Sequence, residues 1–117
     1  MIVPESGAMA WLLRDGQVLA SLDIAGSFTE RVEGLLKRRE LDVAVLLRHK
    51  RIAHAIGLHF PVDVAFLDRD LLVTRTRRLK PYRVARPSLS ARNVLVAGEG
   101  AFERWSLKAG DRLEIKE

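Results

Sequence analysis

The sequence predicts a mainly β fold, a small barrel-like or sandwich domain of short, mostly antiparallel strands with one packed α-helix at about 28–39. Three observations lead to this class. Apolar runs of strand length recur along the chain, an Asp-Gly pair separates the first two, and helical periodicity is confined to one segment. The 117 residues are expected to form one domain, 1–117, with a core that needs no disulfide.

The first predicted element is a β-hairpin with strands near 9–14 and 17–24. Asp15 and Gly16 stand between the two apolar runs. A tight two-residue hairpin turn requires positive φ at both positions, and Asp-Gly adopts that conformation readily. The pair therefore predicts where the chain reverses.

The one predicted helix follows over 28–39. Ser27 and Glu30 have the spacing of a capping box, in which each side chain accepts a bond from an otherwise unpaired backbone N–H. The apolar stripe of this segment consists of Phe28, Val32, Leu35 and Leu36. Acidic residues in the first turns and basic residues in the last complement the helix dipole.

The remainder is predicted to be mostly strand. The expected elements are a strand at 42–48, two strands within 61–79 joined by a turn at 68–70, a strand at 93–100, one helical turn from about 102, and a last short strand after a turn at 109–111. The segment 80–92 contains two prolines and no clear period, which predicts an exposed loop.

Composition excludes several kinds of site and location. The chain has no cysteine, so disulfides, thiolate catalysis and cysteine-ligated metals are excluded. No apolar run is long enough to span a bilayer, and the N-terminal residues do not have the pattern of a signal peptide. We therefore expect a cytoplasmic protein with no membrane partner, as a monomer or a weak homo-oligomer.

The net charge of +5 is unevenly distributed. Between Asp70 and Glu99 there is no acidic residue, and the bases there are Arg75, Arg77, Arg78, Lys80, Arg83, Arg86 and Arg92. Such a stretch is typical of a solvated loop, and it also suits a nucleic-acid accessory protein. Tyr82 is its one aromatic residue, fewer than the two or three stacking aromatics of a usual RNA-binding sheet, which weighs against nucleic acid.

The segment HAIGLHFPVDVAFLD, 54–68, carries the candidate site. A carboxylate directly after Pro61-Val62 stands at the entry to an apolar strand, preceded by two histidines and a glycine. We expect a pocket at this point, with a cation supplied by the basic stretch. The favoured function is a binding module for an anionic small molecule or a protein segment. The candidate ligand-binding residues are His54, Gly57, His59, Asp63, Arg77 and Arg78.

Other interpretations of the same residues stay open. A carboxylate can orient an imidazole, so Asp63 with a histidine would suit a hydrolase-like enzyme, although no nucleophile motif accompanies the pair. In a purely structural role, Asp63 would accept backbone N–H bonds at the strand start. The histidines are spaced by five residues, which does not gather them on one metal. No catalytic residue, metal ligand or cofactor is assigned.

The chain resembles the prokaryotic family known as domain of unknown function 192, over about residues 9–115. The segments that carry the resemblance are ERVEGLLKRREL (30–41), HAIGLHFPVDVAFLD (54–68), NVLVAGEGAFERWSL (93–107) and KAGDRLEI (108–115). The resemblance implies a β-rich single domain and brings no assigned activity. Many family members look exported, with a leader, and the N-terminal residues here do not predict one.

This chain matches the family pattern at some positions and departs from it at others. The family's Pro-Leu-Asp corresponds to Pro61-Val62-Asp63, and its closing Gly-Asp turn to Gly110-Asp111. A frequent family glutamate is replaced by Val96, and the family's Trp-Met-Lys-Asn by residues 54–57. Roles that depend on that glutamate or on the Lys-Asn pair do not carry over to this chain.

Overall fold

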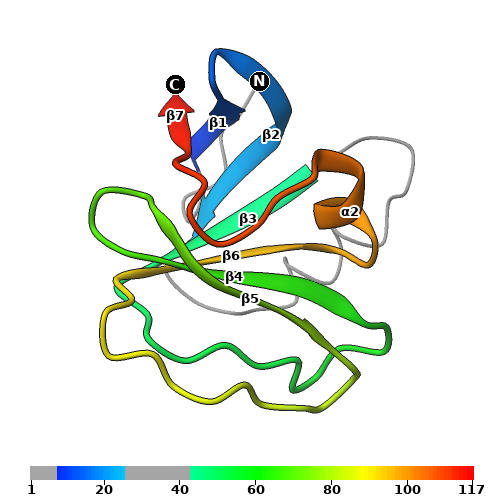
Figure 1. Cartoon of the computed structure of the whole chain (residues 1–117). Coiled ribbons are helices and arrows are strands. Elements are labelled where there is room, and N and C mark those ends of the chain that lie inside the picture. The colour runs from blue at the N-terminus through cyan, green and yellow to red at the C-terminus, as the bar shows by residue number, and fades with distance from the viewer. Residues whose placement is uncertain (1–7, 26–42) are drawn as a thin grey trace.

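The computed structural model describes residues 8–25 and 43–117, and its described part is mainly β (Figure 1). One seven-stranded sheet has the strand order β5-β4-β6-β3-β2-β1-β7. The strands are β1 Ala8–Arg14, β2 Gln17–Ala25, β3 Val43–Arg48, β4 Val62–Leu67, β5 Val73–Leu79, β6 Asn93–Gly98 and β7 Glu114–Lys116, and the described helix is α2 Ala101–Trp105. The sheet is sandwich-like and does not close into a barrel, which confirms the predicted fold class.

The predicted hairpin is confirmed. β1 and β2 pair antiparallel from Ala8–Ile24 to Arg14–Gln17, and the turn residues Asp15 and Gly16 have φ of 52° and 79°. Positive φ at both positions is the conformation that the Asp-Gly pair predicts.

The strand pairs described are antiparallel with one exception, β2 and β3, which are parallel. Parallel neighbours need a crossover connection, since the chain must return to the same end of the sheet. Residues 26–42 stand between these two strands in the sequence. The helix predicted over 28–39 falls in this stretch and lies outside the described residues.

The sheet buries apolar side chains on both faces. On β4, Ala65 and Leu67 belong to one buried cluster, together with α2 and the segment after it. Val64 and Phe66 alternate with them and belong to a second cluster on the opposite face. We call the first the helix face and the second the loop face of the sheet.

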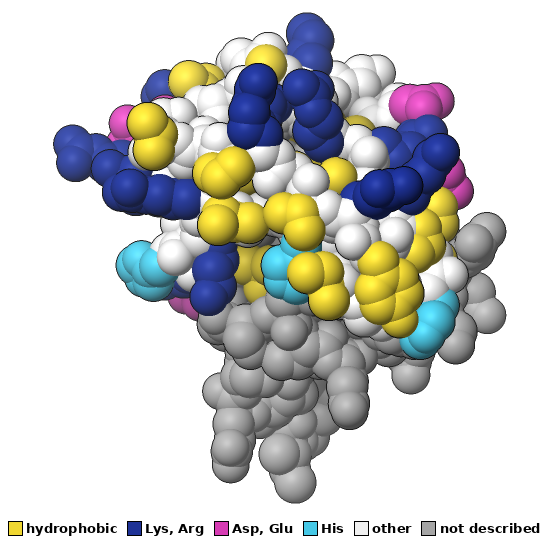
Figure 2. All heavy atoms as spheres, turned by 90° about the horizontal axis from the view of Figure 1, so that it is seen from below, with side chains coloured by type: hydrophobic (Ala, Val, Ile, Leu, Met, Phe, Trp, Pro, Cys, Tyr) yellow, Lys and Arg dark blue, Asp and Glu magenta, His cyan; other side chains and the backbone are white. Residues whose placement is uncertain are grey.

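Two irregular segments, residues 50–61 and 80–92, cover the loop face, and we call them together the loop layer. Their buried alanines and Leu58 pack on the sheet. Backbone hydrogen bonds join the two segments, for example from Ala55 N to Arg83 O at 2.8 Å. Figure 2 views this side of the molecule. Across residues 8–25 and 43–117, no helix is long and apolar enough to cross a membrane.

Candidate functional site: an acid–arginine cluster beside β5

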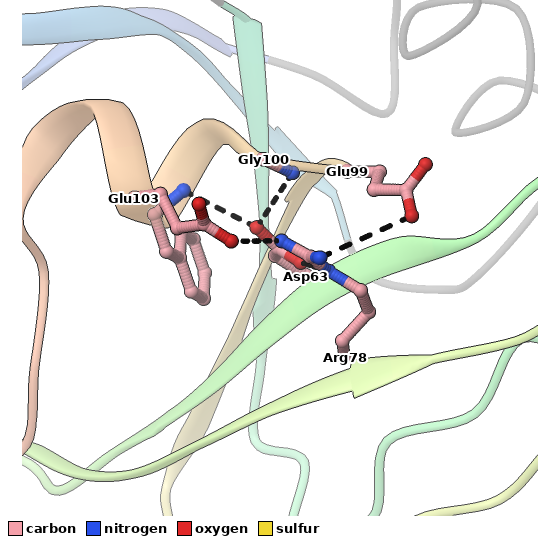
Figure 3. A network of polar contacts seen from close by, with 6 residues as sticks. Asp63, Arg78, Glu99, Gly100 and Glu103 are labelled. Atoms are coloured by element: carbon pink, nitrogen blue, oxygen red, sulfur yellow. Dashed lines mark hydrogen bonds and ion pairs between the residues drawn. The ribbon is translucent and has the colours of Figure 1, made fainter.

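Asp63 is a buried carboxylate at the start of β4, and its side chain is 4% exposed. It points to the helix face because it alternates with Val62 and Val64 of the loop face. Its Oδ2 accepts hydrogen bonds from Gly100 N at 3.1 Å and from Phe102 N at 3.2 Å (Figure 3). These two bonds replace part of the hydration that the carboxylate loses on burial.

The short helix α2 supplies these two donors. Gly100 stands at its start with φ of 88°, and the buried side chains Ala101, Phe102 and Trp105 hold the helix on the sheet. The first N–H groups of any helix have no partner within it. Asp63 satisfies two backbone donors at this point, which fixes α2 to β4.

Arg78 is the register partner of Asp63 on the neighbouring edge strand β5. Its Nε donates to Asp63 Oδ1 at 2.9 Å, its Nη2 to Glu103 Oε1 at 3.0 Å, and its Nη1 lies 4.0 Å from Glu99 Oε2. The hydrogen bond to Asp63 and then that to Glu103 raise the pKa of Arg78 above its usual value. The guanidinium is a permanent cation held by carboxylates.

A hollow of about 540 Å³ opens beside this cluster. Phe102 and Leu107 give it apolar surface, while Thr76 and Ser106 bring hydroxyl groups. The complete lining is Asp63, Thr76, Arg77, Arg78, Phe102, Glu103, Ser106, Leu107 and Lys108. The hollow therefore combines a cation, hydroxyl groups and an apolar wall.

The predicted histidines lie on the other side of the sheet. His54 forms a β-bridge with Val84, and its Nδ1 accepts a hydrogen bond from Ile56 N at 3.1 Å. The ring of His59 meets that of Tyr82 edge-on at 6.3 Å. Both histidines therefore belong to the loop layer. The structure brings Asp63 together with Arg78, and the sheet separates it from the imidazoles.

We expected Gly57 and Arg77 to line one pocket with Asp63, and the structure does not place all three together. Gly57 lies in the loop layer with φ of 88°, and an added Cβ would meet nothing within 4 Å. The positive φ therefore explains why glycine suits this position, whereas close packing of another group against it does not. Arg77 lines the hollow, yet its register partner Val64 faces the loop face.

The environment of His54 changes its pKa. Partial burial, and then the charge of Lys50, lower the pKa of its imidazole below 6.5. Among the residues that the structure describes, no group of three or more His, Asp or Glu side chains is arranged to hold a metal ion.

Sequence reasoning missed the glutamates of this cluster. Glu99 lies in the turn before α2 and Glu103 in the first turn of α2, and they are the first acidic residues after the acid-free stretch. That change of charge, next to a predicted helical turn, was the available signal. The sequence signal does not show which of the seven basic residues pairs with the glutamates, because the register between strands decides that pairing.

The fold and the cluster define a small β-sheet domain in which a buried aspartate anchors an edge-strand arginine over a hollow. The family model described as DUF192, Uncharacterized ACR, matches residues 10–115. The chain therefore belongs to this family, which confirms the resemblance seen in the sequence.

Curated relatives and solved structures agree with that assignment. A UPF0127 protein of Pyrococcus horikoshii is 34% identical over 119 residues, covering 97% of both chains. One of Pyrococcus furiosus is 30% identical over 103 residues, 84% of this chain and 89% of that protein.

Two crystal structures share the fold. A protein from Sinorhizobium meliloti 1021, described as a candidate transcription regulator, has a TM-score of 0.73 at 21% identity, over 97% of this chain and 98% of that one. A protein of unknown function from Novosphingobium aromaticivorans has a TM-score of 0.65 at 20% identity, over 97% and 91%. At these identities the likeness concerns the fold alone.

Proposed function

We propose that this protein is a cytoplasmic binding module for a small anionic molecule, one that carries a carboxylate or phosphate group on an apolar body. The observation that carries the proposal is the asymmetric environment of Arg78. Its Nε side is fixed by the buried Asp63, whereas its terminal nitrogens face exposed glutamates. An arginine anchored from behind in this way is prepared to receive an anion at its open edge.

In this proposal Glu103 is the group that the ligand replaces. The Glu103 side chain is 78% exposed, and an exposed ion pair contributes about 0.2–1 kcal/mol. A ligand carboxylate or phosphate offers Arg78 two acceptor oxygens in place of one. Displacing Glu103 therefore costs little compared with the new bidentate contact.

The hollow beside Arg78 supports a ligand with an apolar body. Phe102 and Leu107 provide the apolar wall, and Ser106 and Thr76 provide groups that can orient a polar substituent. Lys108 lies at the rim with its Nζ 3.6 Å from Asp111 Oδ1. These features favour a small molecule over a bare inorganic anion.

The geometry does not favour the hydrolase-like alternative. Asp63 is buried, and both of its oxygens already accept hydrogen bonds from Arg78 and from the backbone at the start of α2, which leaves a substrate little access to it as a general base. His54 and His59 pack in the loop layer, on the far side of β4. Ligand binding does not require Asp63 and a histidine to be in contact, so binding is the function that we propose.

Titration of labelled protein with benzoate and phenyl phosphate tests the proposal, with neutral benzamide as the matched probe. We expect the anions to shift the amide resonances of Gly100, Phe102 and Leu107, since those residues form or adjoin the hollow. Benzamide should leave them nearly unchanged. Equal effects of benzamide and benzoate would contradict the role of Arg78.

Two variants sharpen this test. Arg78→Lys keeps a charge beside Asp63 but loses the planar fork, and we expect about tenfold weaker binding. Glu103→Gln removes the competing carboxylate and should tighten binding about two- to fivefold. Arg112→Ala, an exposed arginine outside the hollow, is the control. Weaker binding in Glu103→Gln would overturn the replacement step.

A further inference from the structure

We propose that the loop layer, residues 50–61 and 80–92, is a docking surface for an anionic lipid bilayer. This surface lies on the opposite side of the sheet from the hollow, so the inference stands independently of the proposed ligand site. Three properties of the layer carry it: its hydrogen-bonded backbone, its exposed large apolar side chains, and its positive charge with no acidic residue.

The backbone of the loop layer is held in place although it forms no regular strand. Tyr82 N donates to Ala55 O and Ala85 N to Ala53 O, each at 2.8 Å, and Ser88 N donates to Arg51 O at 3.0 Å. The two segments thus form an irregular antiparallel ribbon over the sheet. A surface ordered in advance loses little conformational entropy when it binds.

A second tie fastens this ribbon to the sheet. The guanidinium of Arg75 lies over the Phe66 ring, 4.3 Å from its centroid. The same side chain donates to the backbone carbonyl of Arg86 in the loop layer. The ribbon is therefore fixed from beneath, and its outward side chains keep a defined arrangement.

The ribbon leaves several large apolar side chains exposed. Small alanines such as Ala53, Ala55 and Ala85 point inward and are buried. Leu58 is buried with them, and Phe60 packs partly against the same cluster. Five other large apolar side chains of the layer are about half exposed or more: Ile52 49%, Ile56 53%, Tyr82 57%, Val84 56% and Leu89 84%. Exposed apolar side chains gathered on one surface mark an interaction site.

Charge indicates what kind of partner the layer takes. Its bases are Lys50, Arg51, Lys80, Arg83, Arg86 and Arg92, and neither segment contains an acidic residue. Figure 2 shows hydrophobic side chains across the middle of this face, with lysine and arginine around them and histidine among them. A partner that offers apolar contact and negative charge together fits this arrangement.

An anionic bilayer satisfies both requirements better than nucleic acid does. Of the five exposed apolar side chains, four are aliphatic and Tyr82 alone is aromatic, whereas single-stranded nucleic acid is bound by stacking on several aromatics. Leu89 protrudes from its loop between two serines, with Arg86 and Arg92 nearby in sequence. Aliphatic tips flanked by cations bind the interface between acyl chains and anionic headgroups.

Vesicle co-sedimentation tests the inference with the full chain. We expect binding to phosphatidylcholine vesicles that contain one third phosphatidylglycerol, no binding to pure phosphatidylcholine, and weaker binding at high salt. Paired Arg83→Ala and Arg86→Ala changes should weaken binding about 25-fold, about fivefold for each charge near an anionic leaflet. Failure to bind phosphatidylglycerol vesicles would overturn the proposal.

A second set of variants separates insertion from simple charge attraction. Leu89→Ser, in a side chain that is mostly exposed, should weaken vesicle binding severalfold and leave the melting temperature unchanged. Val18→Ser is the matched control, since Val18 is 57% exposed on β2 outside the loop layer. In Leu89→Trp, tryptophan emission should move to shorter wavelength when phosphatidylglycerol vesicles are added. Equal losses in Leu89→Ser and Val18→Ser, or binding of a single-stranded oligonucleotide in preference to vesicles, would contradict a bilayer-binding surface.

Discussion

Asp63 shows how one buried charge can organise a site. Its carboxylate contacts the side chain of Arg78 and the backbone of α2, elements 15 or more residues away in sequence. Such a group is stable only while each partner stays in place, because an unpaired buried charge is costly. The structural and the ligand-binding interpretations of Asp63 are therefore compatible: the aspartate is positioned by structure, and Arg78 presents the ligand contact.

Replacing that charge should weaken the fold measurably. In Asp63→Asn, the neutral amide cannot accept from Arg78 and the two backbone donors equally well, and we expect a loss of about 2–4 kcal/mol in the free energy of unfolding. Urea denaturation measures it. Asp15→Asn is the control, because asparagine suits the positive φ of that turn. A loss below about 0.5 kcal/mol would show that the buried pair is unimportant to stability.

His54 gives the protein a predicted dependence on pH. Partial burial, followed by the charge of Lys50, lowers the pKa of the folded imidazole below 6.5, so the unfolded chain takes up a proton first as pH falls. Stability is therefore complete above pH 6.5 and declines as pH falls from 6.5 through the folded pKa. In His54→Asn, whose amide oxygen can still accept from Ile56 N, the decline in melting temperature between about pH 7 and pH 5 should be smaller. An identical decline in both proteins would contradict this assignment.

At the scale of elements, the β1–β2 hairpin depends on its turn. Gly16 has φ of 79°, and an added Cβ would meet nothing within 4 Å, so a substitution there is opposed by backbone conformation alone. Gly57 in the loop layer has the same properties, with φ of 88°. These two glycines allow the conformational cost to be measured without a steric one.

We expect Gly16→Ala and Gly57→Ala each to destabilise the protein by about 1–2 kcal/mol. Asparagine tolerates positive φ, so Gly16→Asn and Gly57→Asn should lose clearly less. Thermal melts of the four variants make the comparison. If alanine and asparagine were equivalent at either position, the backbone explanation would fail there.

At the scale of the whole molecule, the two proposed surfaces lie on opposite sides of one sheet. Arg78 stands at the hollow of the helix face, and Leu89 extends from the loop layer. They share no contact residue, so we expect the affinity for phenyl phosphate to be the same with and without phosphatidylglycerol vesicles. A change greater than about threefold would reveal coupling through β4 and β5.

Local signals predicted most of the strands because their information lies within a few neighbouring residues. Asp15-Gly16 predicts a turn by its own φ preference, and the run at 62–67 is apolar enough to require burial on both faces. The order of the strands in the sheet could not be predicted from such local signals. β4 lies between β5 and β6, and this order follows from packing of the complete chain.

The candidate site was predictable in part. Asp63 and Arg78 were both singled out, and they meet because strand register places them opposite each other. His54 and His59 were joined to them through closeness in sequence, yet Pro61 and Val62 carry the chain onto the sheet, where successive side chains point to opposite faces. A strand therefore places residues that are close in sequence on opposite faces of the sheet, and pairing between strands brings residues that are distant in sequence together.

The expectation of no membrane partner stays a prediction, and the proposed bilayer surface departs from it. The expectation came from the absence of a long apolar run, which is the requirement for a spanning segment. A docking surface requires no run, since Ile56 and Val84 come from different segments and share a surface through backbone pairing. The sequence by itself determined the strands, the turns and the excess of positive charge, which depend on short-range preference and composition. Only the tertiary structure decided which charges pair, which apolar side chains stay exposed, and on which face each lies, because these depend on register and packing between segments far apart in the chain.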